Sequence, residues 1–389
     1  FHSGKKSIRY FSITRNMSTI YRIPLTKNEP SSKYSWKERV DIHLNIAKSK
    51  YGRLTDPRTL KEVAAKGDEP ISDYSSDIGY FGPATLGGQQ FQLLFDTGSA
   101  DLWVPKVGYN HGAGSQHNTF DTKKSSTFKT DKQPFSITYG TGHTSGIAAT
   151  DTFDFAGFSI ENQAFGLADT VSDDFKDSPF DGILGMAFDQ LAELRAPTPF
   201  QNLVNQHEVS SSVFAFLLGR QKDGTSKNSE LTIGGVDPKF SSHIKFNKVV
   251  DGRGFWQIAL DDAQVNEKQV EIQGKEAIID TGTTLVIIPP ADADAIHNAI
   301  PGATKQSGTY LIPSDTDAVV SFTFGGATYH IKTEDLIVDD AGNGLSVSGI
   351  QGDNMPGMED TWLVGDVFLK NVYNAYDVNK KAVGFAQVK

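Results

Sequence analysis

The tripeptide Asp-Thr-Gly occurs twice in this chain, at residues 96–98 and 280–282, and each copy directly follows an apolar run. The two runs, residues 91–95 and 277–279, are typical of buried strands. A glycine two positions after an aspartate allows a sharp turn in which backbone N–H groups can approach the carboxylate. One copy would be an ordinary turn signal, but two copies in matching surroundings predict two carboxylates at the ends of two equivalent strands.

The similarity between the two halves extends beyond the tripeptide. A hydroxyl residue follows each glycine, Ser99 in the first half and Thr283 in the second, and can donate a hydrogen bond to its own aspartate. Each half also contains a later apolar segment that closes on glycine, at residues 180–185 and 362–365. A repeat of this length indicates two related lobes rather than a solenoid, whose repeating units are much shorter.

Length and composition limit the class of protein. A chain of 389 residues is too long for one ordinary compact domain, and its 37 glycines, 11% aromatic residues and short apolar runs predict mainly β structure. The absence of cysteine excludes thiol catalysis. The sequence contains neither the His-Glu-x-x-His pattern of zinc peptidases nor the Gly-x-Ser-x-Gly elbow of serine hydrolases, which favours the paired carboxylates as the reactive groups.

Charge is distributed unevenly along the chain. The net charge is −10, yet residues 1–66 contain many more Lys and Arg than Asp and Glu, so the remainder is strongly acidic. Within the basic part, Ser35 and Glu38 form a capping-box pattern ahead of apolar residues at helical spacing, which predicts a helix ending near Gly52. A second short helix is expected over residues 56–67. A nucleic-acid-binding arm is an alternative interpretation of this charge, but the apolar stripe of the first helix favours docking onto the acidic body.

Six segments occur in the order typical of one protein family: residues 95–105, 137–146, 180–188, 255–260, 278–284 and 362–368. They resemble the pepsin-like aspartic endopeptidases, in the zymogen form and of fungal type, from about residue 20 to the end of the chain. The resemblance implies a mainly β, bilobal pepsin-like acid protease fold, with two related β lobes, a central cleft and a partly helical N-terminal propeptide. It divides the chain into a leader and inhibitory basic propeptide over residues 1–66, an N-terminal lobe over 67–245 and a C-terminal lobe over 246–389.

The resemblance also implies a catalytic pair, Asp96 and Asp280, facing each other across the cleft. Two carboxylates so close cannot both ionise easily, so they would share one proton and titrate as a coupled pair. A water molecule between them would attack the peptide bond, with Asp96 as acid and Asp280 as base. No metal and no cofactor are required. The residues expected to support the two carboxylates are Ser99, Thr283, Gly98 and Gly282.

A second implied feature is the flap, a mobile hairpin that closes over the substrate. Tyr139, Gly140 and Thr141 would lie on it, with Tyr139 facing the cleft and its hydroxyl hydrogen-bonded toward Trp103. Some relatives carry Asp two residues after the flap Tyr and accept Lys in the first specificity pocket. Thr141 occupies that position here, so we expect cleavage between large hydrophobic residues and little cleavage after Lys.

A third implied feature is a plug in the cleft. In the family, a propeptide Lys followed by Tyr places its ammonium between the catalytic carboxylates. Lys50 and Tyr51 match this pair, and Lys48 is the nearby alternative. A cation held there would favour the charged carboxylates and exclude substrate, whereas acid would weaken the attraction by protonating them. We therefore expect latency near neutral pH and self-processing in acid, with the mature enzyme beginning near residues 67–70.

Further expectations concern partners and location. We expect protein and peptide substrates, the chain's own propeptide as an intramolecular inhibitor, sensitivity to statine-type inhibitors, and a monomer that binds neither nucleic acid nor membrane. Residues 1–18 contain no apolar run long enough for a signal peptide or a membrane span, and the sequence has one N-glycosylation sequon, at Asn16. A secreted protein is favoured over a vacuolar one.

Two other functions are compatible with two lobes and paired carboxylates. A silent pepsin-like binding protein would use the cleft without hydrolysis, but such relatives usually lose an Asp or the flap Tyr, and Asp96, Asp280 and Tyr139 are all present. A glycosidase that uses two carboxylates is the third option.

Overall fold

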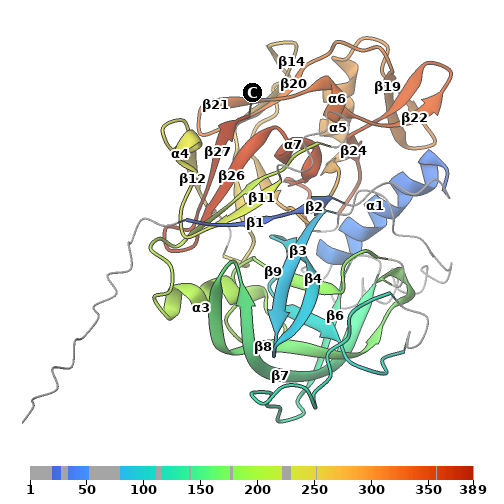
Figure 1. Ribbon diagram of the computed structural model, residues 1–389. Helices are drawn as coiled ribbons and strands as arrows, with labels where there is room; N and C mark the ends of the chain where they lie inside the picture. Colours follow the sequence, from blue (N-terminus) through green and yellow to red (C-terminus); the bar gives the residue numbers. More distant parts are fainter. Residues whose placement is uncertain are drawn as a thin grey trace, which may run out of the picture.

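The computed structural model describes residues 20–27, 34–51, 79–110, 116–139, 142–175, 178–220, 229–250, 252–355 and 357–388. Within these residues the chain is mainly β, with one lobe on each side of a connecting sheet (Figure 1). This architecture confirms the predicted fold class. The predicted helix over residues 56–67, the expected processing region at 67–70 and the sequon at Asn16 lie outside the described residues.

The N-terminal lobe is built on an eight-stranded sheet in the order β2-β3-β4-β9-β5-β8-β7-β6. An additional pairing of β3 with β7, at Thr85 and Leu86, brings two distant strands of this sheet together. The strands are β2 (Thr26–Lys27), β3 (Tyr80–Leu86), β4 (Gln89–Asp96), β5 (Leu102–Pro105), β6 (Pro134–Thr138), β7 (His143–Phe155), β8 (Phe158–Val171) and β9 (Gly182–Gly185).

The C-terminal lobe repeats the centre of this arrangement in a five-stranded sheet, in the order β13-β16-β25-β17-β24. Strand β16 pairs in parallel with β25, as β4 does with β9, and β25 pairs antiparallel with β17, as β9 does with β5. The internal repeat in the sequence is therefore a repeated strand topology. The strands are β13 (Gln257–Leu260), β16 (Lys275–Ile279), β17 (Val286–Ile288), β24 (Ile350–Gly352) and β25 (Thr361–Val364).

The connecting sheet contains strands from distant parts of the chain, in the order β1-β11-β10-β26-β27-β12. Strand β1 comes from the basic N-terminal segment and pairs antiparallel with β11, so this segment extends the sheet by one strand. The aromatic rings of Phe214, Trp256 and Tyr376 pack together on the sheet and contribute to its core. The strands are β1 (Tyr21–Pro24), β10 (Val213–Leu217), β11 (Glu230–Ile233), β12 (Lys245–Lys248), β26 (Val372–Asp377) and β27 (Ala382–Gln387).

Two smaller sheets complete the C-terminal lobe, in the orders β15-β14-β20-β21 and β18-β19-β23-β22. The strands of the first are β14 (Asp262–Val265), β15 (Lys268–Gln269), β20 (Val320–Phe324) and β21 (Ala327–Ile331). The strands of the second are β18 (Thr304–Gln306), β19 (Thr309–Pro313), β22 (Ile337–Gly342) and β23 (Leu345–Ser348).

Helix α1 (Trp36–Tyr51) begins where the capping box predicts. Ser35 N donates to Glu38 Oε2 at 2.8 Å, and Glu38 N donates back to Ser35 Oγ at 3.4 Å, so two free backbone donors of the first turn are satisfied. The other helices are α3 (Pro199–Asn205), α4 (Pro238–Ser241), α5 (Pro290–Asn298), α6 (Thr333–Leu336) and α7 (Asp366–Leu369), with 3-10 turns at Asp173–Phe175 and Asp189–Leu191.

A buried histidine joins α5 to the sheet formed by β18, β19, β23 and β22. His297 Nδ1 donates to Ala293 O at 2.8 Å, its Nε2 lies 2.8 Å from Ser348 Oγ, and its ring stacks on Tyr310 with centroids 4.4 Å apart. Because a carbonyl can only accept, Nδ1 carries the proton and Nε2 accepts from the hydroxyl. Burial lowers the pKa of His297 from 6.5 to about 4.

Replacing His297 should therefore flatten the pH dependence of stability. The stabilisation from the neutral ring is present above pH 6.5 and is lost as the pH falls through 4, an effect on the order of 3 kcal/mol. We expect the free energy of unfolding of His297→Gln to fall less between pH 7 and pH 4 than that of the parent. Urea denaturation in an Asp280→Asn background, which avoids self-digestion, measures this difference.

The matched control is His243→Gln, because the side chain of His243 is exposed. This variant should keep the pH dependence of the parent. Equal pH dependence in both His variants would contradict the assignment of acid sensitivity to His297.

Candidate active site

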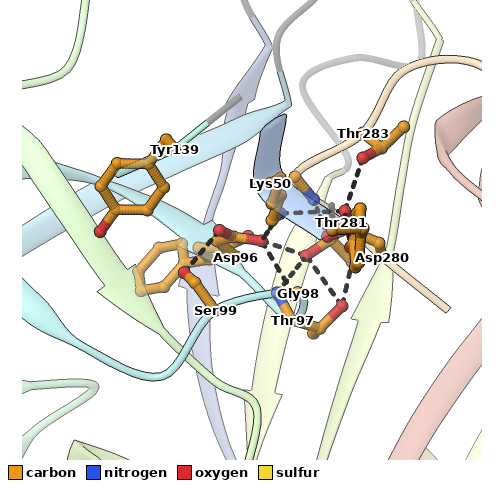
Figure 2. Close-up of polar contacts among 12 residues, drawn as sticks. Lys50, Asp96, Thr97, Gly98, Ser99, Tyr139, Asp280, Thr281 and Thr283 are labelled. Atoms are coloured by element: carbon orange, nitrogen blue, oxygen red, sulfur yellow. Dashed lines mark hydrogen bonds and ion pairs between the residues drawn. The ribbon is translucent and has the colours of Figure 1, made fainter. Parts of the chain in front are cut away.

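The two Asp-Thr-Gly loops, which follow β4 and β16, are bound to each other by their middle threonines. Thr97 N donates to Thr281 Oγ1 at 3.1 Å, and Thr281 N donates to Thr97 Oγ1 at 3.0 Å. Each hydroxyl also donates to the strand of the other half, Thr97 Oγ1 to Ile279 O at 2.9 Å and Thr281 Oγ1 to Phe95 O at 2.8 Å. These four buried hydrogen bonds fix the two loops side by side (Figure 2).

Each loop holds its own carboxylate with a matching pair of donors, and both carboxylates are buried. The glycines are needed for close approach. A Cβ on Gly98 would stand 2.6 Å from the carboxyl carbon of Asp280, and a Cβ on Gly282 would stand 2.7 Å from that of Asp96. The donors are Gly98 N (2.9 Å) and Ser99 Oγ (2.5 Å) to Asp96, and Gly282 N (2.9 Å) and Thr283 Oγ1 (2.5 Å) to Asp280.

One cation lies between the two carboxylates. Lys50, in the last turn of α1, places Nζ 2.7 Å from Asp96 Oδ1 and 2.9 Å from Asp280 Oδ2 (Figure 2). The hydroxyl of Tyr51 donates to Asp280 Oδ2 at 2.6 Å. The Lys50 side chain is only 7% exposed, so its charge is neutralised mainly by the two aspartates and hardly by solvent.

The alternative plug, Lys48, lies elsewhere. Its Nζ pairs with Asp353 of the C-terminal lobe at 2.6 Å. Two arginines of the N-terminal segment pair with acids of the body as well, Arg22 with Asp237 at 2.9 Å and Arg39 Nε with Asp339 at 2.6 Å. The basic segment thus contacts the acidic body through specific ion pairs.

The surroundings of the two carboxyl groups shift their pKa values in opposite directions. Burial raises the pKa of Asp96, and the charge of Lys50 offsets this only in part. Burial also acts to raise the pKa of Asp280, but the Lys50 ammonium and hydrogen bonds, including those from Thr283 and Tyr51, outweigh it and lower that pKa to about 2. The two carboxyl groups therefore differ in acidity while Lys50 and Tyr51 are in contact with them.

Tyr139 follows β6, the first strand of the predicted flap hairpin, which pairs antiparallel with β7. Its hydroxyl accepts a hydrogen bond from Trp103 Nε1 at 2.8 Å. Phe175 packs edge-on against both rings, with centroids 5.4 Å from Trp103 and 5.8 Å from Tyr139. The result is an apolar cluster on the side of the site that carries Asp96. The other two flap residues, Gly140 and Thr141, lie outside the described residues.

Sequence reasoning did not identify the role of Thr97 and Thr281. The only available signal was that the middle position of both tripeptides is a threonine, and this does not reveal a bond between the copies. The individual acid partners of Arg22, Arg39 and Lys48 were also not predictable, because they depend on how distant segments meet.

Among the described residues, no group of three or more His, Asp or Glu side chains is arranged to hold a metal ion. None of the helices in the described part of the chain is long and apolar enough to cross a bilayer.

Comparison with known proteins identifies the family of the chain. The sequence profile of the eukaryotic aspartyl protease family matches residues 79–388. The chain is 38% identical to a probable aspartic-type endopeptidase CTSD of Arthroderma benhamiae, over 89% of this chain and 69% of the relative. It is 34% identical to cathepsin E of Aquarana catesbeiana (95% and 94% covered) and 33% identical to rhizopuspepsin-4 of Rhizopus niveus (94% and 92% covered).

The chain therefore belongs to the eukaryotic aspartyl protease family and is pepsin-like. It is an aspartic-type endopeptidase, a class of hydrolases. Several of the relatives are fungal, in line with the expected fungal type.

Removing the Thr97 hydroxyl should weaken the junction between the loops. In Thr97→Val the N–H of Thr281 and the carbonyl of Ile279 lose their partner, which should cost about 1–3 kcal/mol of unfolding free energy. Thr97→Ser keeps the hydroxyl and should stay much closer to the parent. Urea denaturation of the intact chain at neutral pH measures both, and equal stability of the two variants would contradict the role given to these bonds.

Proposed function

We propose that this protein is an acid endopeptidase that activates water between Asp96 and Asp280 and is held latent by its own N-terminal segment. The single observation that carries the proposal is the position of Lys50 Nζ, within hydrogen-bonding distance of both carboxylates. One ammonium can reach both only if the two side chains face a common space. Once the segment leaves, that space is available for a water molecule and a peptide bond.

In the proposed reaction, Asp280 is the base and Asp96 the acid. Asp280 takes a proton from the water molecule as its oxygen bonds to the peptide carbonyl carbon. Asp96 donates its proton to the carbonyl oxygen, giving a neutral tetrahedral diol. The C–N bond then breaks as Asp280 gives its proton to the leaving nitrogen and Asp96 takes a proton back from a diol hydroxyl, which leaves a carboxylic acid and an amine. Ser99 and Thr283, which donate to the Oδ2 atoms, keep both carboxylates oriented.

Latency follows from the same electrostatics. The Lys50 ammonium stabilises ionised carboxylates and occupies the place of the water molecule, and Tyr51 fills the adjoining space. Because Asp280 has a pKa of about 2 here, below the ordinary 3.8, the attraction is complete above the ordinary value and is lost as the pH falls toward 2. Acid therefore weakens the contact that keeps the segment in place.

The apolar cluster around Tyr139 supports a preference for hydrophobic side chains beside the scissile bond. Trp103, Phe175 and Phe180 belong to this cluster. Proposed partners are protein and peptide substrates, the propeptide as an intramolecular inhibitor, and statine-type inhibitors, for a monomer without nucleic-acid or membrane partners. We propose secretion as the location, with the vacuole as the alternative.

Acid-treated protein should hydrolyse a peptide panel, with the highest rates where large apolar residues flank the scissile bond and little cleavage after Lys. A statine-type inhibitor should block this activity, and Asp280→Asn should lower kcat by about a thousandfold or more because the base is lost. Stopped peptide assays analysed by mass spectrometry report both rate and cleavage site. Folded protein that binds the inhibitor but hydrolyses nothing would favour the silent binding protein instead.

Lys50→Ala should give the intact, unprocessed chain measurable peptidase activity, and Lys48→Ala should not. Loss of the buried cation removes the group that both carboxylates contact, so hydrolysis of a fluorogenic peptide near pH 6 should rise by about tenfold or more. Lys48 pairs with Asp353 rather than with the two carboxylates, and its side chain is partly exposed, which makes Lys48→Ala a matched control. If Lys50→Ala remains as latent as Lys48→Ala, Lys50 is not the plug.

A further inference from the structure

Helix α1 covers one face of the small sheet formed by β18, β19, β23 and β22. Val40 packs with Leu311 of β19 and Val347 of β23 in a buried apolar cluster. Trp36 and Leu44, four residues before and after Val40, pack at its edges. Successive residues of a strand point to opposite faces, so the neighbours of Leu311 and Val347 face α5 on the other side. The sheet under α1 is thus packed against α5 on its far side. On its near side it is contacted by three apolar residues of α1 that are four positions apart.

Acidic side chains flank this apolar face. Asp339 of β22 accepts from Arg39, and Asp353, which follows β24, pairs with Lys48. Both acids can form ion pairs with cations on either side of the apolar stripe of a bound helix. The face therefore combines a hydrophobic centre with negative charge at two edges.

The position of the face relative to the cleft is fixed by the helix. Figure 1 shows α1 running from beside β22 toward the middle of the molecule. Val40 and Lys50 are ten residues apart, which corresponds to about 15 Å along a helix. A helix seated on the face therefore delivers the chain that follows it to the two catalytic carboxylates.

We propose that, in the processed enzyme, the face formed by Leu311, Val347 and Asp339 is a docking site for amphipathic basic helices of protein substrates. The inference rests on the proposed function, since removal of the N-terminal segment uncovers the face. A newly exposed apolar patch with a charged rim is a surface suited to a partner. The preferred helix carries apolar residues at every fourth position and a cation next to the central one, as α1 does.

Docking would act through effective concentration. A helix held on the face keeps the adjoining segment near the cleft, so the second contact becomes intramolecular and the apparent KM falls. The chemistry at the carboxylates is unchanged, so kcat should change little. A fall in KM at constant kcat therefore distinguishes docking on the face from a change in the catalytic cleft.

The test compares two substrates for the acid-processed enzyme at one mildly acidic pH. Both contain the same cleavable peptide. One is preceded by the sequence of residues 34–47 and a Gly/Ser linker of about ten residues, which spans roughly 17 Å. The helix-bearing substrate should show kcat/KM about tenfold higher, almost entirely through KM. Its matched control carries Val40→Ser and Leu44→Ser and should lose the advantage.

A charge exchange makes the test specific to this face. The enzyme variant Asp339→Lys should discriminate less between the two substrates, and a substrate helix carrying Arg39→Glu should restore the preference. For each enzyme, kcat/KM for the short peptide is the reference. Only the ratio of kcat/KM for the helix-bearing substrate to this reference is interpreted. Equal kcat/KM for all linked substrates, with the short peptide cleaved normally, overturns the docking site and leaves the proposed function intact.

If the short peptide itself is not hydrolysed, the proposed function fails, and direct binding still tests the face. Fluorescence anisotropy of a labelled peptide with the sequence of residues 34–47 then measures docking on protein from which an added protease has cut away the N-terminal segment. Saturable binding that is weakened by Asp339→Lys supports the docking site. No binding up to about 1 mM, or binding unaffected by that variant, overturns it.

Discussion

Two threonine hydroxyls, buried where the lobes meet, determine how the rest of the site is built. Thr97 and Thr281 each receive a backbone N–H of the opposite loop and donate to the strand that precedes it. This reciprocal bonding couples the ends of β4 and β16 and so decides how close two acids can come. Like charges at such a distance repel in a site of low dielectric, so the arrangement is stable only with a shared proton or a cation. In the intact chain Lys50 is that cation.

Three kinds of contact join the N-terminal segment to the body. Strand β1 adds to the edge of β11, α1 covers an apolar face of the C-terminal lobe, and four cations in the described part of the segment pair with acids of the body. Only the last kind responds directly to acid. Protonation of the carboxylates should therefore weaken the ion pairs before the apolar and main-chain contacts. In the proposed latent state, release of the segment would therefore depend on pH while the body itself stays stable.

Local patterns made much of this structure predictable. Two of these patterns lie within a few residues: the turn after each apolar run and the capping box of α1. The repeated order of apolar segments was also visible in the sequence, and it corresponds to the repeated strand pairing in the two lobes. Contacts between residues of distant segments were harder to predict from the sequence. Choosing between Lys48 and Lys50 depends on the rotation of α1 against the lobe, and one residue along a helix turns a side chain by about 100°. The threonine exchange between Thr97 and Thr281 likewise requires knowing that two distant loops face each other.

The central claim is that one ammonium occupies the space between two carboxylates where hydrolysis would take place. A crystal structure of the intact chain at neutral pH tests it most directly. The account predicts density for the Lys50 side chain with Nζ in hydrogen-bonding contact with both Asp96 and Asp280. An ordered water molecule bridging the two aspartates, with Lys50 directed to solvent, would contradict it.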